Sequence, residues 1–143
     1  MNTPYKILAI DSNHECLNNG LRDAGFTVDE DYVSSKESIE EKIANYDGLI
    51  VRSRFPIDKT FLSKATKLKF IGRVGAGLEN IDEDFAADRN IVLFNSPEGN
   101  RDSVGEHAVG MLLMLMHHLC RADNEVRNGI WKREENRGDE LKG

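Results

Sequence analysis

The sequence predicts an α/β fold in which a parallel sheet is covered by helices on both faces. Three observations support this prediction. Short apolar runs alternate with helical stretches five times, several of the runs are continuous in Val, Ile and Leu, and no low-complexity tract or Pro/Gly/Ser linker divides the 143 residues. Because parallel crossovers are right-handed, the expected architecture is a doubly wound sandwich of five strands, flavodoxin-like or Rossmann-like.

Each element has its own local signal. The strands are expected at the apolar runs, over residues 5–11, 27–33, 48–53, 68–75 and 91–97. The helices are expected over residues 13–26, 35–46, 58–67, 82–90 and from about 103 to 128. The first helix carries an apolar stripe closed by Gly25, the second has an N-cap at Ser34 or Ser35, and the last has a capping box of Ser103 and Glu106. The second strand is the weakest of the five and is expected at a sheet edge.

Composition is that of a soluble globular protein, with 39% hydrophobic and 31% charged residues. A net charge of −6 argues against sequence-independent nucleic-acid binding, which needs a basic face. The longest uncharged apolar run, residues 108–116, is too short to span a membrane, and no segment reads as a signal peptide. Cys16 and Cys120 lie far apart and fit reduced thiols, so we expect a cytoplasmic protein. The run 117–120, HHLC, lacks the spacing of a metal site, and none is expected.

Chemistry-bearing residues follow the strands of the predicted sheet. They are Asp11 and Ser12, Arg52 to Arg54, Gly75 to Gly77, and Asn95 to Asn100. Doubly wound sheets bind ligands beyond the carboxyl ends of their strands. An acid, two arginines, a glycine turn and an amide-rich loop therefore share one rim, which we expect to receive an anion.

The turn Gly75-Ala76-Gly77 departs from a dinucleotide-binding fingerprint. Asn80 stands in place of the third glycine, the next helix begins late, and the following strand ends in Asn95 instead of a ribose-binding acid. Two interpretations remain. The glycines form only a tight turn, or they leave backbone N–H groups bare for a small anion.

Arg52 favours the anion interpretation, because it follows the apolar run 48–51 and must either extend to the solvent at the rim or meet a carboxylate or phosphate there. A guanidinium there holds a ligand carboxylate or phosphate, or forms a structural salt bridge with Asp11 or Asp82. Asn100 is a further site candidate, since it precedes the last helix, whose dipole favours an anion. Glu106 is expected to be structural.

Four segments resemble the N-terminal portion of a D-isomer-specific 2-hydroxyacid dehydrogenase. They are VRSR, IGRVGAGLENID, NSPEGNRDSVGEHAVGMLL and RADNEVRNGIWKREENRGDELKG, and the resemblance covers nearly the whole chain. It implies a flavodoxin-like substrate-binding domain over residues 1–100. It also implies that residues 101–143 hold a long helix crossing to an NAD-binding domain, whose remainder is absent from this sequence.

The resemblance implies roles for residues of the rim. Arg52, Ser53 and the backbone of Gly75–Gly77 would hold the carboxylate and hydroxyl of a 2-hydroxy acid substrate. Arg54 would be a candidate for a phosphate on the substrate, and Asn100 would border the active site.

The resemblance also implies a cofactor and a partner. Ala76 and Val104 would lie against the nicotinamide end of NAD. The long helix and the region of Trp131 would form a homodimer. The family's Gly-x-Gly-x-x-Gly and its catalytic arginine, glutamate and histidine follow the point that corresponds to Gly143, so no catalytic residue is expected in this chain. Residues 108–116 are apolar all round and would need cover on every side, which agrees that something is absent. We therefore expect a truncated or proteolytically cut piece that does not turn over substrate.

Two alternatives stay open from the residues alone. The chain could be a stand-alone flavodoxin-like module that binds a small carboxylate, or a dimerisation fragment built on its apolar helix. A receiver domain is disfavoured, because the third strand is followed by Arg52 where a phosphoacceptor aspartate is required.

Overall fold

The computed structural model describes residues 4–142 and contains a five-stranded, all-parallel sheet. The strands are β1 (Lys6–Ala9), β2 (Thr27–Glu30), β3 (Gly48–Val51), β4 (Phe70–Arg73) and β5 (Val92–Phe94). Their order in the sheet is β2-β1-β3-β4-β5, the flavodoxin-like arrangement. The predicted fold class is confirmed, and the weak second strand lies at an edge as expected.

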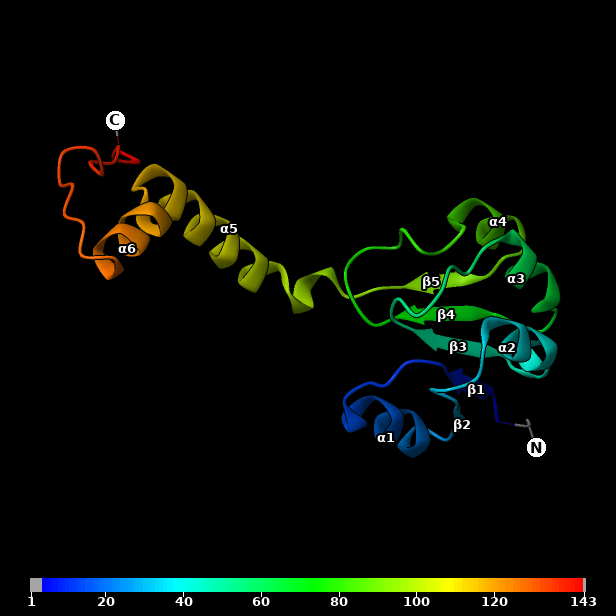
Figure 1. Cartoon of the computed structure of the whole chain (residues 1–143). Helices are drawn as coiled ribbons and strands as arrows, with labels where there is room; N and C mark the ends of the chain where they lie inside the picture. The colour runs from blue at the N-terminus through cyan, green and yellow to red at the C-terminus, as the bar shows by residue number, and fades with distance from the viewer. Residues whose placement is uncertain (1–3, 143) are drawn as a thin grey trace. The chain divides into compact units, whose positions relative to one another are not determined.

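Helices cover both faces of this sheet. They are α1 (Glu15–Asp23), α2 (Lys36–Lys42), α3 (Lys59–Lys64) and α4 (Glu83–Asp88), with 3₁₀ turns η1 (Ile43–Asn45) and η2 (Pro97–Gly99). Helix α1 packs on one face, and α2, α3 and α4 pack on the other (Figure 1).

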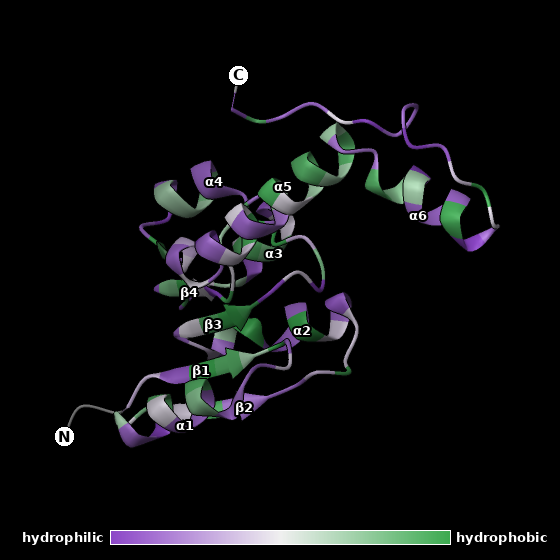
Figure 2. Ribbon diagram, turned by 90° about the vertical axis from the view of Figure 1, so that its left-hand side faces the viewer, coloured by the Kyte–Doolittle hydropathy of each residue, from purple (hydrophilic) through white to green (hydrophobic). Residues whose placement is uncertain are grey.

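The core is divided by the sheet into two layers. The larger layer joins Leu8, Leu49 and Ile71 of the strands to side chains of α2, α3 and α4, and the smaller joins Ile7 and Ile50 to the stripe of α1. Strand β3 is buried at all four positions, which explains its unbroken apolar run. In Figure 2, β1 and β3 carry the hydrophobic colour along most of their length.

The chain divides into two compact units between Gly99 and Asn100. The second unit contains α5 (Arg101–Met116) and α6 (Leu119–Arg127). The segment after α6 folds back on these helices, because Arg121 Nε donates to Asn136 Oδ1 at 2.8 Å and the Asp139 N–H donates to Met116 O at 3.1 Å. That this unit begins an NAD-binding domain stays a prediction. Among the described helices, none is long and apolar enough to cross a bilayer.

The structure corrects the prediction of one long helix over 103–128. The helix begins at Arg101 with Asn100 as its N-cap residue, so Ser103 lies inside the first turns and forms no capping box. It ends at Met116 with His117 as its C-cap residue, and His118 adopts a left-handed conformation with φ of 52° before α6 begins. The break falls at two consecutive histidines and contains neither glycine nor proline, the residues that usually signal a helix end. The second helix is also shorter than predicted, but its N-cap at Ser35 is confirmed by the bond from the Ser38 N–H at 3.3 Å.

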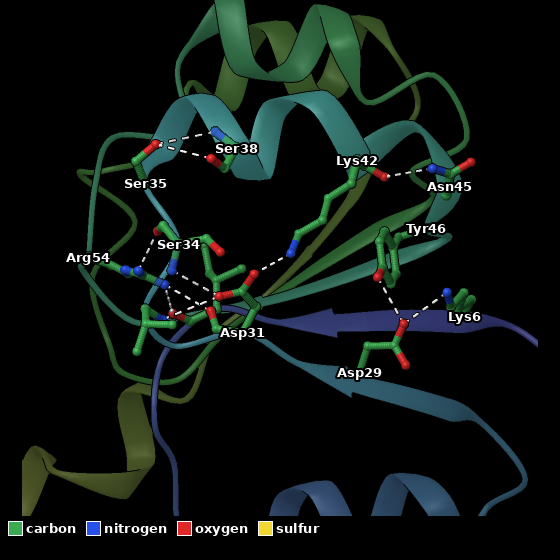
Figure 3. Close-up of polar contacts among 12 residues, drawn as sticks. Lys6, Asp29, Asp31, Ser34, Ser35, Ser38, Lys42, Asn45, Tyr46 and Arg54 are labelled. Atoms are coloured by element: carbon green, nitrogen blue, oxygen red, sulfur yellow. Dashed lines mark hydrogen bonds and ion pairs between the residues drawn. The ribbon is translucent and has the colours of Figure 1, made fainter.

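Edge strand β2 is stabilised by paired acids, which explains its polar sequence. Asp29 accepts a hydrogen bond from the Tyr46 hydroxyl at 2.8 Å and pairs with Lys6 Nζ of β1 at 2.8 Å (Figure 3). Just after β2, Asp31 pairs with Lys42 of α2 and accepts the Ser34 N–H at 2.9 Å. The hydrogen bond from Lys6 lowers the pKa of Asp29 below its usual 3.8, and that from Lys42 holds the pKa of Asp31 far below the same value.

These lowered pKa values predict acid sensitivity. A carboxylate with a folded-state pKa below its unfolded value stabilises the fold above pH 4, and this contribution is lost as pH falls toward the folded value. We expect the free energy of unfolding to decline below about pH 4 in urea titrations. Asp31→Asn should be less stable at pH 7 and should decline less steeply between pH 5 and pH 3. Asp88→Asn, an exposed position on α4, is the control and should follow the parent curve. Parallel curves for Asp31→Asn and the parent would contradict this assignment.

Candidate functional site

The candidate site lies at the carboxyl ends of β1, β3 and β4. Strands β1 and β3 are neighbours, but the chain leaves them toward opposite edges of the sheet, so a crevice forms between their ends. Asp11 follows β1, Arg52 follows β3, and the Gly75–Gly77 turn follows β4. The rim that the sequence predicted is therefore present in the fold.

Arg52 is held by its backbone and not by its side chain. Its N–H donates to Asp11 Oδ2 at 2.6 Å, and its carbonyl accepts from Asn80 Nδ2 at 3.2 Å. Its side chain is exposed, and the guanidinium makes no hydrogen bond or ion pair with any residue in the range 4–142. The alternative of a salt bridge to Asp11 or Asp82 is not found there. Asp11 binds the main chain, and Asp82 caps α4 by accepting the Phe85 N–H at 3.0 Å.

The glycine turn is fixed by the end of β5. Ser96 N–H donates to Gly75 O at 2.9 Å, and Asn95 Nδ2 donates to Ala76 O at 2.6 Å. Gly75 has φ of 150°, a conformation that favours glycine. Its own N–H donates to Arg73 O at 3.0 Å, which corrects the expectation that this amide is bare. Within the described part of the chain the N–H groups of Ala76 and Gly77 have no acceptor, so these two amides are the ones available to an anion.

The turn does not fit a dinucleotide pyrophosphate. Residues 78–82 run beside Ile57, whose N–H donates to Asn80 O at 2.7 Å, and α4 begins only at Glu83. That helix is capped by Asp82 and opens with Glu83 and Asp84, three acids that repel a phosphate at its N-terminus. The structure therefore shows the same departure from the dinucleotide-binding fingerprint that the sequence predicted.

Arg54 lies two residues beyond Arg52 and is used differently. Nη1 donates to Ile10 O at 2.9 Å and to Asp31 O at 2.8 Å, and Nη2 donates to Ser34 O. Figure 3 shows the side chain reaching beneath the loop that carries Asp31 and Ser34. This tie between three loops was missed by sequence reasoning. The predicted role of Arg54 as a phosphate ligand stays a prediction, although three of its five N–H donors are already occupied.

The other predicted residues are distributed over both units. Ser53 is exposed immediately after Arg52. Asn100 and Val104 belong to the second unit, where the Val104 N–H donates to Asn100 O at 2.9 Å in the first turn of α5. Their roles beside the substrate and cofactor stay predictions.

A hollow next to the rim was not predicted. It has a volume of about 330 Å³, and its polar lining comes from Asn13 and His14 after β1, Arg73 at the end of β4, and Asn95 and Ser96 after β5. Arg73 was read only as part of a strand. Its place as the last residue of an apolar run, like that of Arg52 after β3, was the available signal.

The fold defines the class of the chain as an α/β domain with a flavodoxin-like parallel sheet. The family model for "D-isomer specific 2-hydroxyacid dehydrogenase, catalytic domain" matches residues 7–136. The chain therefore belongs to the D-isomer-specific 2-hydroxyacid dehydrogenase family, as the resemblance indicated.

Curated relatives within the family are similar over most of the chain. The D-3-phosphoglycerate dehydrogenase of Archaeoglobus fulgidus is 34% identical over 96% of this chain, and that of Homo sapiens is also 34% identical over 96%. The chain spans 26% of each of these relatives, about a quarter of their length.

Solved structures agree with the fold. A Pyrococcus horikoshii protein superposes with a TM-score of 0.81 at 27% identity, over 91% of this chain and 39% of that one. NAD⁺-bound 3-phosphoglycerate dehydrogenase of Entamoeba histolytica superposes with a TM-score of 0.66 at 32% identity, over 80% of this chain and 40% of that one.

Substitutions of the two arginines of VRSR, Arg52 and Arg54, should have different effects on the free energy of unfolding. Arg54→Ala removes three charge-assisted bonds to main-chain carbonyls, and we expect it to lower the free energy of unfolding by about 2 kcal/mol. Arg52→Ala removes no side-chain hydrogen bond or ion pair with a described residue. It should change the free energy of unfolding by less than about 0.5 kcal/mol. Urea denaturation followed by circular dichroism measures both. Equal losses in the two variants would contradict this division.

Proposed function

We propose that the chain is the N-terminal substrate-binding portion of an NAD-dependent D-2-hydroxyacid dehydrogenase. We further propose that the substrate is D-3-phosphoglycerate, oxidised to 3-phosphohydroxypyruvate in serine biosynthesis. The observation that carries the proposal is the Arg52 guanidinium, which is unpaired with any described residue at a rim that also offers two unbonded amides. The choice of substrate is supported by the D-3-phosphoglycerate dehydrogenases that are 34% identical to the chain over 96% of its length.

The proposed binding mode follows from the chemistry of the rim. A carboxylate accepts two parallel N–H bonds from a guanidinium, an arrangement that fixes orientation as well as position. Arg52 binds the substrate carboxylate in this way, and the amides of Ala76 and Gly77 donate to one of its oxygens. The hydroxyl of Ser53 lies next in sequence to Arg52 and hydrogen-bonds the substrate hydroxyl. The rim thus orients the C2 carbon that is oxidised.

NAD, when bound, supplies the hydride acceptor. We propose that Ala76 and Val104 lie near its nicotinamide end and that Asn100 borders the substrate. We assign no proton- or hydride-transferring group to the described residues, so the 143-residue chain alone should bind substrate without oxidising it. A cytoplasmic location belongs to the same proposal.

We also propose a homodimer through α5 and the region of Trp131. Helix α5 exposes apolar side chains along its length, among them Val104, Met111 and Leu115, and Trp131 is 79% exposed. An exposed apolar surface of this kind is typical of a protein interface.

A binding module is the second candidate function. The same rim would serve a domain that senses a small carboxylate, because nothing in the rim itself requires hydride transfer. The module and the dehydrogenase portion differ in ligand preference. A portion of the proposed dehydrogenase should prefer D-3-phosphoglycerate, whereas a general carboxylate sensor should bind acetate or D-lactate equally well.

The test is titration calorimetry on the 143-residue chain with D-3-phosphoglycerate. We expect binding in the millimolar range or tighter, and we expect Arg52→Ala to weaken it by about 10- to 100-fold, the worth of a charged bidentate contact. Lys67→Ala, an exposed position, is the matched control and should bind as the parent does. Unchanged binding in Arg52→Ala, or no binding by the parent chain, would contradict the proposal.

A further inference from the structure

We propose that Asn95 is a positioning residue of the rim: it fixes the direction of the Gly77 N–H, so that this amide donates to the substrate carboxylate. The inference rests on the proposed function and deepens it, because it assigns a task to a side chain outside the glycine turn. It depends on three features of the structure. They are the bond from Asn95 to the turn, the planarity of the peptide unit that accepts this bond, and the bonding of the neighbouring peptide units.

The end of β5 is attached to the glycine turn through two consecutive residues. Asn95 Nδ2 donates to Ala76 O at 2.6 Å, and the Ser96 N–H donates to Gly75 O at 2.9 Å. Strands β4 and β5 are paired as far as Phe94, so these two bonds continue the contact between the strands beyond the sheet. The attachment therefore starts from the sheet, and one of its two bonds comes from a side chain that a substitution removes.

A bond to a carbonyl also orients an N–H, because the C=O of one residue and the N–H of the next belong to one planar peptide unit. In a trans unit the two groups point in opposite directions. The unit that joins Ala76 to Gly77 is trans. It contains the carbonyl that Asn95 binds and an N–H that has no acceptor among the described residues. Asn95 therefore directs the Gly77 N–H away from itself.

The preceding peptide unit is held by the main chain instead. The Ser96 N–H binds its carbonyl, that of Gly75, and its N–H is the unbonded one of Ala76. This bond survives any substitution at position 95. Two adjacent donors are thus oriented by two adjacent residues at the end of β5, one through a side chain and one through the main chain. The Ala76 amide is therefore an internal control for the Gly77 amide.

The nearest acid does not decide the direction of the Gly77 amide. The Glu79 carboxylate lies against Gly77, since a Cβ built on this glycine would lie 2.1 Å from Glu79 Oε1. Within residues 4–142, however, no hydrogen bond joins the Gly77 N–H to this carboxylate. A ligand anion must be bound in spite of the nearby negative charge. The direction and strength of the amide donors therefore matter more here than they would at a neutral turn.

A fixed direction raises the affinity of an amide for an anion. A donor that already points at the ligand loses less conformational freedom on binding than a donor that samples several directions. The hydrogen bond to Ala76 O also polarises the peptide unit and strengthens its N–H as a donor. Loss of the Asn95 bond should therefore weaken substrate binding without changing the charge of the rim.

The experiment measures the Gly77 amide and substrate binding in the same variants. In the 143-residue chain, ¹⁵N relaxation should give order parameters of about 0.85 for the N–H groups of Ala76 and Gly77. Asn95→Ala should lower the value for Gly77 below about 0.6, the range of flexible backbone, and leave that of Ala76 at the parent value. Calorimetric titration of the same variant with D-3-phosphoglycerate should show binding weakened about three- to tenfold.

Further variants control for the shape of the side chain and for the fold. Asn95→Gln keeps the amide donor and should bind within about twofold of the parent. Asn45→Ala removes a bond of the same kind, from Asn45 Nδ2 to Lys42 O at 3.2 Å, before the start of β3, and should bind as the parent does. Circular dichroism establishes that each variant is folded. If Asn95→Ala is not, Asn95→Asp, which keeps the shape and cannot donate when ionised, should give the same two changes.

The outcomes separate this inference from the proposed function. If the parent binds D-3-phosphoglycerate and Arg52→Ala weakens binding while Asn95→Ala binds normally, the positioning role is overturned and the proposed function stands. The inference is also overturned if the order parameters of Ala76 and Gly77 fall together, or if Asn95→Gln weakens binding as much as Asn95→Ala. The side chain then supports the turn as a whole and does not orient one amide. If the parent does not bind the ligand, the proposed function fails and the inference fails with it.

Discussion

The hydrogen bond from the Arg52 N–H to Asp11 Oδ2, 2.6 Å long, joins the ends of β3 and β1 at the rim. Asp11 follows the neighbouring strand and is the acid best placed to neutralise Arg52. Its carboxylate accepts the Arg52 main-chain N–H and forms no ion pair with the guanidinium, which is unpaired among the described residues. The Asp11 carboxylate thus holds the end of β3 through its main chain, and the Arg52 guanidinium is left for a ligand. An acid in the ligand then becomes the natural partner of that cation.

Three arginines that follow or end β3 and β4 differ in the contacts of their side chains. Arg54 joins the loop after β1 to the loop between β2 and α2 through three main-chain carbonyls, so most of its donors serve the fold. Arg52 and Arg73 end adjacent strands and make few contacts of their own. Parallel strands place such residues side by side without any long loop, since every strand ends at the same edge.

Much of the fold follows from the sequence because the sheet is parallel and buried. Strand β3 is buried at all four of its positions, so an unbroken apolar run was sufficient to find it, and right-handed crossovers left few possible strand orders. The helix break at His118 could not be predicted, since a left-handed histidine carries no turn-forming signal in one sequence. The N-cap at Asn100 in place of Ser103 is a choice between two good capping residues, which only the surrounding loop decides.

The sequence was sufficient to predict which residues lie at the rim. It was not sufficient to predict the hydrogen bonds that those residues form. The sequence placed Arg52 and the glycine turn at one rim, but it could not show that the Gly75 amide bonds its own strand while the Ala76 and Gly77 amides do not. It could not show that the Arg54 guanidinium donates to three main-chain carbonyls while that of Arg73 donates to one, because the partners are set by the fold. Partners that come from distant loops, such as Ser34 or Asn95, carry no local signal.

The most direct measurement is a ¹H–¹⁵N NMR titration of the labelled chain with D-3-phosphoglycerate. If the rim binds the substrate carboxylate, the amide resonances of Ala76 and Gly77 and the side-chain Nε–H of Arg52 will move progressively with ligand. The Gly75 amide, already bonded to Arg73 O, will move less. Changes confined to the second unit, or changes at Ala76 and Gly77 that persist unaltered in Arg52→Ala, would contradict the proposed site.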